Sequence, residues 1–131
     1  FQLMPSGRLN AKADGRYVQV TTAIVDYVAN DDELAWVLAH EFAHNLLGHR
    51  ARLRAAGVPR GFLRQLGRNA RRVRDTETEA DRLSVYLMER AGYDAGAALR
   101  FWSRYGPSRP SFFDSPTHPR WRDRVAVLTE E

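Results

Sequence analysis

The chain has 131 residues, of which 44% are hydrophobic and 27% charged, and its net charge is +4. These values predict one folded domain over residues 1–131 and exclude a disordered chain, and no apolar run approaches the roughly 20 residues that cross a bilayer. Because cysteine is absent, a disulfide framework and a thiolate metal site are excluded, and any metal must be held by His, Asp or Glu.

The first predicted elements are a short strand and a short helix. Residues 16–20 (RYVQV) are rich in Tyr and Val and lie between Asp14-Gly15 and a pair of threonines, which is typical of a strand. Thr21 or Thr22 then caps a helix that we expect to run through Val28.

A long helix is predicted over about residues 32–55. Asn30 followed three residues later by Glu33 is a capping-box start, and the acidic first turn suits the positive end of a helix. An apolar face at helical spacing follows, and Gly57 and Pro59 end the helix. The residues of that face are Leu34, Val37, Leu38, Phe42 and Leu46.

The rest of the chain is predicted to be helical with two interruptions. Residues 61–74 mix glycine with arginine, which indicates a loop or a weak helix. A second strong helix should begin at Thr76, with Glu79 completing a possible capping box. Further boundaries are a helix end at Ala91, a helix over 94–104 stopped by Gly106-Pro107, a loop over 108–119 and a last helix over 119–128. The predicted fold class is mainly α with a small β-sheet (α+β).

The motif His-Glu-Phe-Ala-His at residues 40–44 lies on the long helix. Side chains four residues apart share a helix face, so His40 and His44 can present both imidazoles to one metal ion. Glu41 is displaced around the helix, where it can hold a metal-bound water as a general base. The alternative is that both histidines are satisfied by ordinary hydrogen bonds and that Glu41 lies on the exposed side.

A catalytic zinc needs a third protein ligand and an open fourth position. His49 lies about 140° around a continuous helix from His44, so we expect it to point away. In the later Glu-Thr-Glu-Ala-Asp segment, Glu77 and Asp81 share a face, whereas Glu79 lies about 200° from Glu77. Glu77 is therefore predicted to complete the ligand set, with Asp81 accepting the free ring N–H of a ligand histidine. The alternative is an acidic first turn of a helix.

These motifs together resemble the HtpX and CAAX-prenyl-protease type of gluzincin zinc peptidase, over nearly the whole chain. The spacer between the two metal-binding motifs is shorter than in many relatives, and Ala11-Lys12-Ala13 stands where relatives are more apolar. The matching segments are Leu9-Asn10-Ala11, residues 14–21 (DGRYVQVT), 31–35 (DDELA), 40–44 (HEFAH) and 77–81 (ETEAD), and Thr117-His118-Pro119 through Arg124.

The resemblance implies a division of roles among the residues of the two motifs. His40, His44 and Glu77 would bind zinc, and Glu41 would activate the zinc-bound water. Asp81 would support a ligand histidine without binding the metal itself.

The resemblance also implies roles for two residues near the end of the chain. His118 would lie close to the metal, where it stabilises the oxyanion or occupies the fourth position in a latent state, and Arg124 would lie beside the site. The implied fold is a gluzincin-like core with an active-site helix and a short substrate-binding edge strand. We expect an extended substrate to pair along residues 16–20.

The predicted function is that of a zinc-dependent endopeptidase acting on peptides or unfolded proteins. The alternative is a latent or non-catalytic zinc-containing, chaperone-like binding module of the cell envelope. The resemblance suggests a periplasmic or membrane-associated location, and a signal, anchor or further domain could precede Phe1.

Nine of the arginines fall between Arg50 and Arg74. This run could contact a membrane surface or another anion, which gives a third hypothesis, an anion-binding module. A solvated, partly mobile surface is the ordinary interpretation. No nucleic-acid-binding motif accompanies the run, so no nucleic acid is expected as a partner.

Overall fold

The computed structural model describes residues 1–58 and 67–108 of the chain. This part is mainly helical with a small mixed sheet, which confirms the predicted fold class. The elements in chain order are β1 (Gln2–Met4), β2 (Ala11–Ala13), β3 (Val18–Thr21), α1 (Thr22–Tyr27), α2 (Asp31–Leu46), α3 (His49–Ala55), α4 (Gly67–Ala91) and α5 (Ala97–Ser108).

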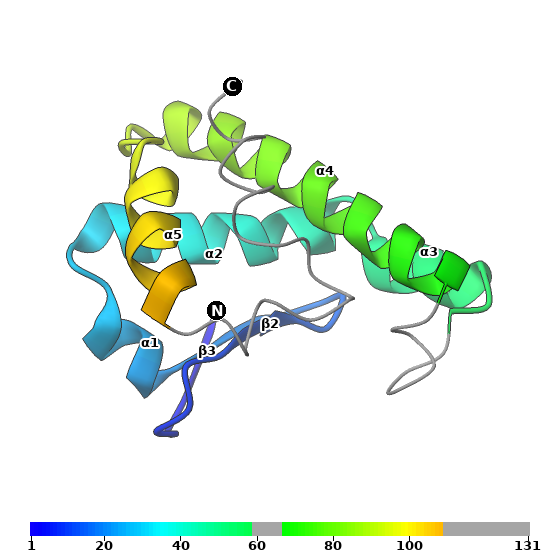
Figure 1. Ribbon diagram of the computed structural model, residues 1–131, viewed down its shortest axis with the longest axis horizontal. Helices are drawn as coiled ribbons and strands as arrows, with labels where there is room; N and C mark the ends of the chain where they lie inside the picture. Colours follow the sequence, from blue (N-terminus) through cyan, green and yellow to red (C-terminus); the bar gives the residue numbers. More distant parts are fainter. Residues whose placement is uncertain (59–66, 109–131) are drawn as a thin grey trace.

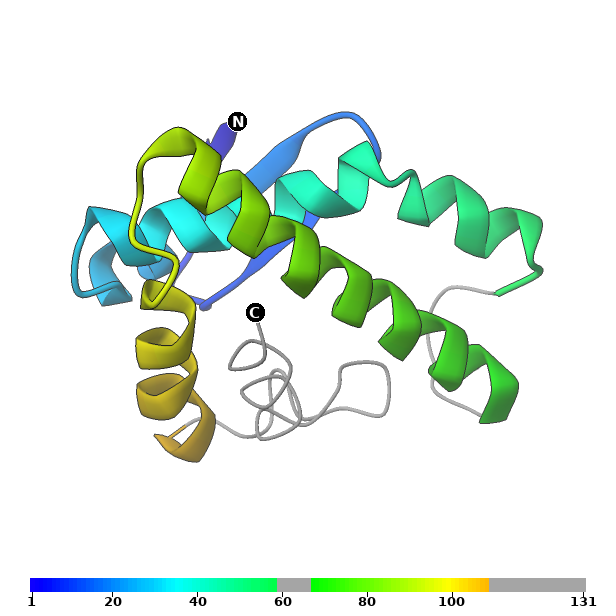
Figure 2. The same cartoon turned by 90° about the horizontal axis from the view of Figure 1, so that it is seen from above.

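The helix α2 lies between the sheet and α4. Figure 1 shows the sheet below α2 and α4 above it, and Figure 2 shows α4 crossing α2 when the molecule is seen from above. The helix α5 lies across one end of this arrangement, and α3 lies at the other end beside the start of α4 (Figure 1). Side chains of α2 therefore face two different layers, and those directed toward α4 form the site described below.

The predicted strand at residues 16–20 is present as β3, but it is the central strand of the sheet. It pairs in parallel with β1, where Leu3 is opposite Val20, and antiparallel with β2, where Lys12 is opposite Gln19. The prediction that a substrate pairs along this strand as an edge is therefore wrong, because both of its sides are occupied. The edge strands are β1 and β2, three residues each, which are too short to show a strand pattern in the sequence.

Both predicted helix starts near residues 21–33 are confirmed. The Thr21 hydroxyl accepts a hydrogen bond from the Ile24 amide and caps α1. Asn30 caps α2 by accepting from the Glu33 amide, while the Glu33 carboxylate accepts from the Ala29 amide. These bonds satisfy amide groups that a helix start otherwise leaves without partners.

The helix predicted over residues 32–55 is divided in two. The first helix ends at Leu46, and Gly48 adopts a left-handed backbone conformation with φ of 63°. Glycine has no Cβ and accepts this conformation readily, so the chain turns here and a new helix, α3, begins at His49. The break changes the direction of every side chain after Gly48. Gly57, with φ of 78°, follows the end of α3 as predicted, and Pro59 lies outside the described residues.

The predicted apolar face of α2 is only partly buried. Val37 belongs to the core, and Leu34 and Leu38 pack against it. Phe42 and Leu46, however, are 41% and 55% exposed. The inward face of α2 also carries the two histidines and the buried glutamates. It is therefore not the purely apolar face that the sequence pattern predicted.

The helix α4 begins at Gly67 rather than near Thr76. Arginine is a good helix former, and Ala70 and Val73 extend the buried face of the helix toward its start. Thr76 is consequently not a cap, since its hydroxyl lies inside the helix and donates to the Val73 carbonyl at 2.6 Å. The segment 61–74, predicted as a loop or weak helix, is therefore helical from Gly67 onward, and residues 59–66 lie outside the description.

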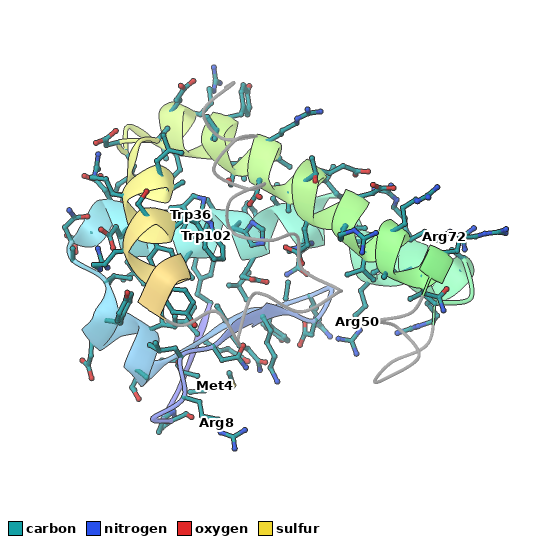
Figure 3. The ribbon with its side chains drawn as sticks, in the orientation of Figure 1. Met4, Arg8, Trp36, Arg50, Arg72 and Trp102 are labelled. Carbon is teal, nitrogen blue, oxygen red and sulfur yellow. The ribbon has the colours of Figure 1, made fainter. Side chains whose placement is uncertain are left out.

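The hydrophobic core gathers where α5 packs against α2. Phe101, Trp102 and Tyr105 are each at most 1% exposed. Trp36 of α2 contacts Phe101 and Trp102, with ring centroids 5.2 and 5.9 Å away, and Figure 3 shows the two tryptophans close together. The helix α5 itself runs to Ser108, so the predicted stop at Gly106-Pro107 is wrong. The loop and last helix predicted after 108 lie outside the described residues.

Within residues 1–58 and 67–108, no helix has both the length and the apolar character needed to span a membrane.

Candidate metal centre

The packing of α4 on α2 brings three side chains to one point. His40 and His44 come from successive turns of α2, and Glu77 comes from the middle of α4. His40 Nε2 lies 3.0 Å from Glu77 Oε2, His44 Nε2 lies 3.4 Å from the same oxygen, and the two Nε2 atoms are 3.2 Å apart. Within the described residues, this is the group of three that could hold a metal ion.

The spacing of these atoms suits zinc. Four ligands placed tetrahedrally at about 2.0–2.1 Å from a zinc ion lie roughly 3.3–3.4 Å from one another. The three observed separations, 3.0 to 3.4 Å, are close to that value without any rearrangement. Two imidazoles and one carboxylate are also one of the ligand sets that catalytic zinc sites use.

Asp81 fixes the ring of His40. Its Oδ1 atom lies 2.9 Å from His40 Nδ1, and its side chain is 1% exposed. A carboxylate can only accept, so Nδ1–H donates to Asp81, and the lone pair of His40 Nε2 is then available to a metal bound between His40 and Glu77. Asp81 therefore occupies the place in which the sequence predicted a supporting carboxylate.

His49 supports the second histidine, which sequence reasoning missed. It is 2% exposed, and its Nδ1 atom lies 2.8 Å from Nδ1 of His44. The expectation that His49 points away is wrong because it assumed a continuous helix, whereas the chain turns at Gly48. The glycine directly before His49 was the sequence signal that could have revealed this arrangement.

An ion pair between Glu79 and Arg52 connects His49 to the protein surface. His49 Nε2 lies 3.0 Å from Glu79 Oε2, and the Arg52 guanidinium donates to both oxygens of Glu79 at 2.9 and 3.2 Å. These hydrogen bonds from Arg52 lower the pKa of Glu79 to about 2, against the opposing effect of burial. Burial lowers the pKa of His49 and outweighs the raising effect of Glu79. Glu79 is thus an ionised carboxylate, and His49 beside it is a neutral imidazole.

The remaining predicted site residues divide into those that the structure describes and those that it does not. Glu41 follows His40 in α2 and is 8% exposed, so the alternative that it lies on the exposed side is wrong. His118 and Arg124 lie outside the described residues, and their roles stay predictions.

Asn45 connects the metal centre to the sheet. Its Oδ1 atom accepts from the Gly15 amide at 2.8 Å, and its Nδ2 atom donates to the Tyr17 carbonyl at 3.1 Å. Both partners belong to the turn between β2 and β3, and Asn45 directly follows His44. The turn after β2 is thereby fastened to the residue that follows His44, a contact for which the sequence carries no signal.

Comparisons with known proteins place these features in one family. The family model of peptidase family M48 matches residues 1–60 and 61–131. The chain is similar to the mitochondrial metalloendopeptidase OMA1 of Schizosaccharomyces pombe, with 30% identity over 138 residues, covering 88% of this chain and 41% of that protein. It is also similar to the enzyme of the same name from Saccharomyces cerevisiae, with 32% identity over 112 residues, covering 69% of this chain and 31% of that protein.

A bacterial protein shows a comparable likeness. The putative beta-barrel assembly-enhancing protease of Vibrio cholerae is 26% identical over 163 residues, which covers 99% of this chain and 34% of that protein. The chain therefore spans between about a third and two fifths of the length of these relatives.

Proposed function

The chain belongs to peptidase family M48, and from this premise we propose that it is the catalytic domain of a zinc-dependent endopeptidase. The observation that supports the proposal most directly is the convergence of His40 Nε2, His44 Nε2 and Glu77 Oε2 at 3.0 to 3.4 Å. In this proposal these three residues bind zinc and Glu41 is the general base. The finer likeness to HtpX and CAAX-prenyl proteases rests on motif order alone.

The proposed chemistry uses a zinc ion held by the three ligands and the buried carboxylate of Glu41. A zinc ion bound here would polarise the scissile carbonyl and lower the pKa of a bound water. Glu41 would accept a proton from that water as its oxygen attacks the carbonyl carbon, and would pass the proton to the amine nitrogen as the C–N bond breaks. One water is consumed, and one carboxyl and one amino terminus are formed.

The substrate would lie along β2, not along β3 as first expected. The strand β2 is an edge of the sheet and contacts α2, and Asn45 holds the turn that follows it beside His44. A peptide added to this edge gains main-chain hydrogen bonds with little demand on its sequence. We propose peptides or unfolded proteins as the substrates, and His118 as an additional group at the oxyanion.

The variant Glu41→Gln tests this proposal because it removes the base without touching the three ligands. We expect it to retain stoichiometric zinc and to lose casein cleavage by at least about 100-fold. Glu89→Gln, at an exposed position of α4, is the control and should cleave as the wild type does. Retained cleavage by Glu41→Gln would overturn the assignment. A wild type that binds zinc but cleaves nothing would favour the non-catalytic, chaperone-like module.

We propose a location in the cell envelope or at a membrane, which is supported by the resemblance and by the arginine-rich segment. Arg54, Arg68, Arg71 and Arg72 are exposed, and Figure 3 shows Arg72 and Arg50 at the end of the molecule where α3 and the start of α4 lie. Such a surface would attract anionic lipid. Co-sedimentation with vesicles of phosphatidylserine and phosphatidylcholine should be strong at low salt and weak at high salt; equal binding to pure phosphatidylcholine would contradict it.

A further inference from the structure

The two histidines of the metal centre are supported in different ways. The Nδ1 atom of His40 meets a buried carboxylate, Asp81, at 2.9 Å. The Nδ1 atom of His44 meets a second imidazole, that of His49, at 2.8 Å. Metal-binding histidines usually donate their other ring N–H to a carboxylate, a carbonyl or water. The proposed function leaves His49 and its partners without a role.

We propose that His49, held by Glu79 and Arg52, is a positioning residue that fixes the ring orientation and tautomer of His44 and thereby sets the zinc affinity of the centre. The proposal rests on the proposed function, because it assumes that His44 binds zinc. It adds a chain of side chains that runs from the exposed Arg52–Glu79 pair to the metal ligand.

The direction of these hydrogen bonds follows from Glu79, whose carboxylate can only accept. His49 therefore donates its Nε2–H across the 3.0 Å contact. A neutral imidazole that donates from Nε2 has an acceptor at Nδ1, and this atom can accept the Nδ1–H of His44. His44 then has its lone pair on Nε2, the atom 3.4 Å from Glu77 Oε2, where the lone pair is available to a metal bound between the two side chains. The hydrogen bonds therefore assign one proton to Nε2 of His49 and one to Nδ1 of His44.

The hydrogen-bonded side chains Arg52, Glu79, His49 and His44 are positioned by three helices. His49 and Arg52 lie one turn apart on α3 and both reach Glu79 on α4, while His44 lies at the end of α2. The turn at Gly48 makes this possible, since a continuous helix would carry His49 away from His44. Arg52 binds both carboxylate oxygens, so Glu79 is held in one orientation.

The competing explanation is that the cluster only fastens α3 to α4. A fastening role and a positioning role predict different results for two substitutions at residue 49. His49→Asn places a carbonyl oxygen near the position of Nδ1 and can still accept from His44, although its contact with Glu79 is lost. His49→Phe keeps the ring volume and removes the acceptor. Both variants lose the contact between residue 49 and Glu79 that helps to fasten α3 to α4. Only His49→Phe also loses the acceptor for His44.

The measurement is the zinc dissociation constant of the purified protein, by competition with a chromophoric chelator, with the unfolding midpoint of each metal-free variant beside it. We expect His49→Phe to bind zinc about 10- to 100-fold more weakly and His49→Asn to recover most of the loss. The ¹⁵N spectrum of the metal-free wild type and of His49→Asn should show His44 protonated at Nδ1, and that of His49→Phe a mixture of tautomers.

A matched pair of surface variants provides the control. Arg52 and Arg100 each donate to one carboxylate from a half-exposed position, the latter to Asp94 at 2.8 Å. Arg52→Gln should weaken zinc binding, whereas Arg100→Gln should not. Equal zinc affinity in wild type and His49→Phe, or equal losses in both His49 variants, would overturn the inference and leave the proposed function intact. A wild type without zinc would overturn both.

Discussion

His40 Nδ1 lies 2.9 Å from Oδ1 of Asp81, a carboxylate that is buried between α4 and α2. This contact determines which nitrogen of His40 carries the proton. It therefore determines whether Nε2 can present a lone pair to a metal beside Glu77.

The first prediction concerns Asp81→Asn. This variant removes the charge and replaces a group that can only accept by an amide that can also donate, so the tautomer with the proton on His40 Nδ1 is no longer enforced. We expect zinc to bind about 10- to 100-fold more weakly, as measured by chelator competition. Asp94→Asn, at an exposed site away from the cluster, should bind zinc as the wild type does. Unchanged affinity in Asp81→Asn would show that the contact does not control the ring.

The second prediction concerns the stability of the fold. Arg104 donates to both oxygens of Glu33 at 3.0 and 2.7 Å, and the Glu33 side chain is 2% exposed. Arg104→Met would leave a buried carboxylate without its cation, although Arg104 is 40% exposed and the Ala29 amide still donates to Glu33, so we expect a cost of about 1.5–3 kcal/mol in the free energy of unfolding by urea. Arg100→Met removes an exposed ion pair and should cost at most about 1 kcal/mol. Similar losses in both variants would contradict this explanation.

The third prediction is a dependence of stability on pH. Burial raises the pKa of Glu33, but hydrogen bonds from Arg104 and from the Ala29 amide outweigh it and hold the pKa below its ordinary value. A carboxyl group with a lower pKa in the folded state stabilises the fold above its unfolded pKa, and this contribution is lost as the pH falls through the folded pKa.

The stability difference between wild type and Glu33→Gln should consequently be largest near neutral pH and should shrink below about pH 4. Urea unfolding of both proteins at a series of pH values measures it. A difference that grows on acidification would mean that the pKa of Glu33 is raised in the fold.

The fourth prediction separates the substrate strand from the metal. Asn45→Ala removes the two hydrogen bonds that hold the turn after β2, so a bound peptide would lose its alignment with the metal centre. We expect kcat/KM for casein-derived peptides to fall about 10-fold or more with full zinc content. Gln19→Ala removes an exposed side-chain contact with Gln2 on the other side of the sheet and serves as the control. Loss of zinc in Asn45→Ala would instead place Asn45 in the metal centre.

Local sequence signals predicted a large share of this arrangement. The caps at Thr21 and Asn30 depend on residues within three positions of each other, and the shared face of His40 and His44 depends only on helical periodicity. The sequence spacing that pairs Glu77 with Asp81 is of the same kind. These features could be predicted because they depend only on the local backbone and not on residues far away in the sequence.

The errors arose where long-range contacts decided the outcome. The pairing of β1 and β2 with β3 joins segments that show no strand pattern of their own. The early start of α4 depends on burial of Ala70 and Val73, which arginine-rich composition conceals. Gly48 was visible in the sequence as a glycine, but only the contact between His49 and His44 shows that the turn directs His49 into the site.

The proposed metal centre is tested most directly by the zinc content of the wild type beside Glu77→Ala, with casein cleavage measured on the same samples and Glu89→Ala as the control. We expect about one zinc per chain in the wild type and in Glu89→Ala. In Glu77→Ala we expect zinc and cleavage to be lost together. A wild type without zinc, or a Glu77→Ala variant that keeps both zinc and activity, would contradict the two-histidine, one-glutamate centre.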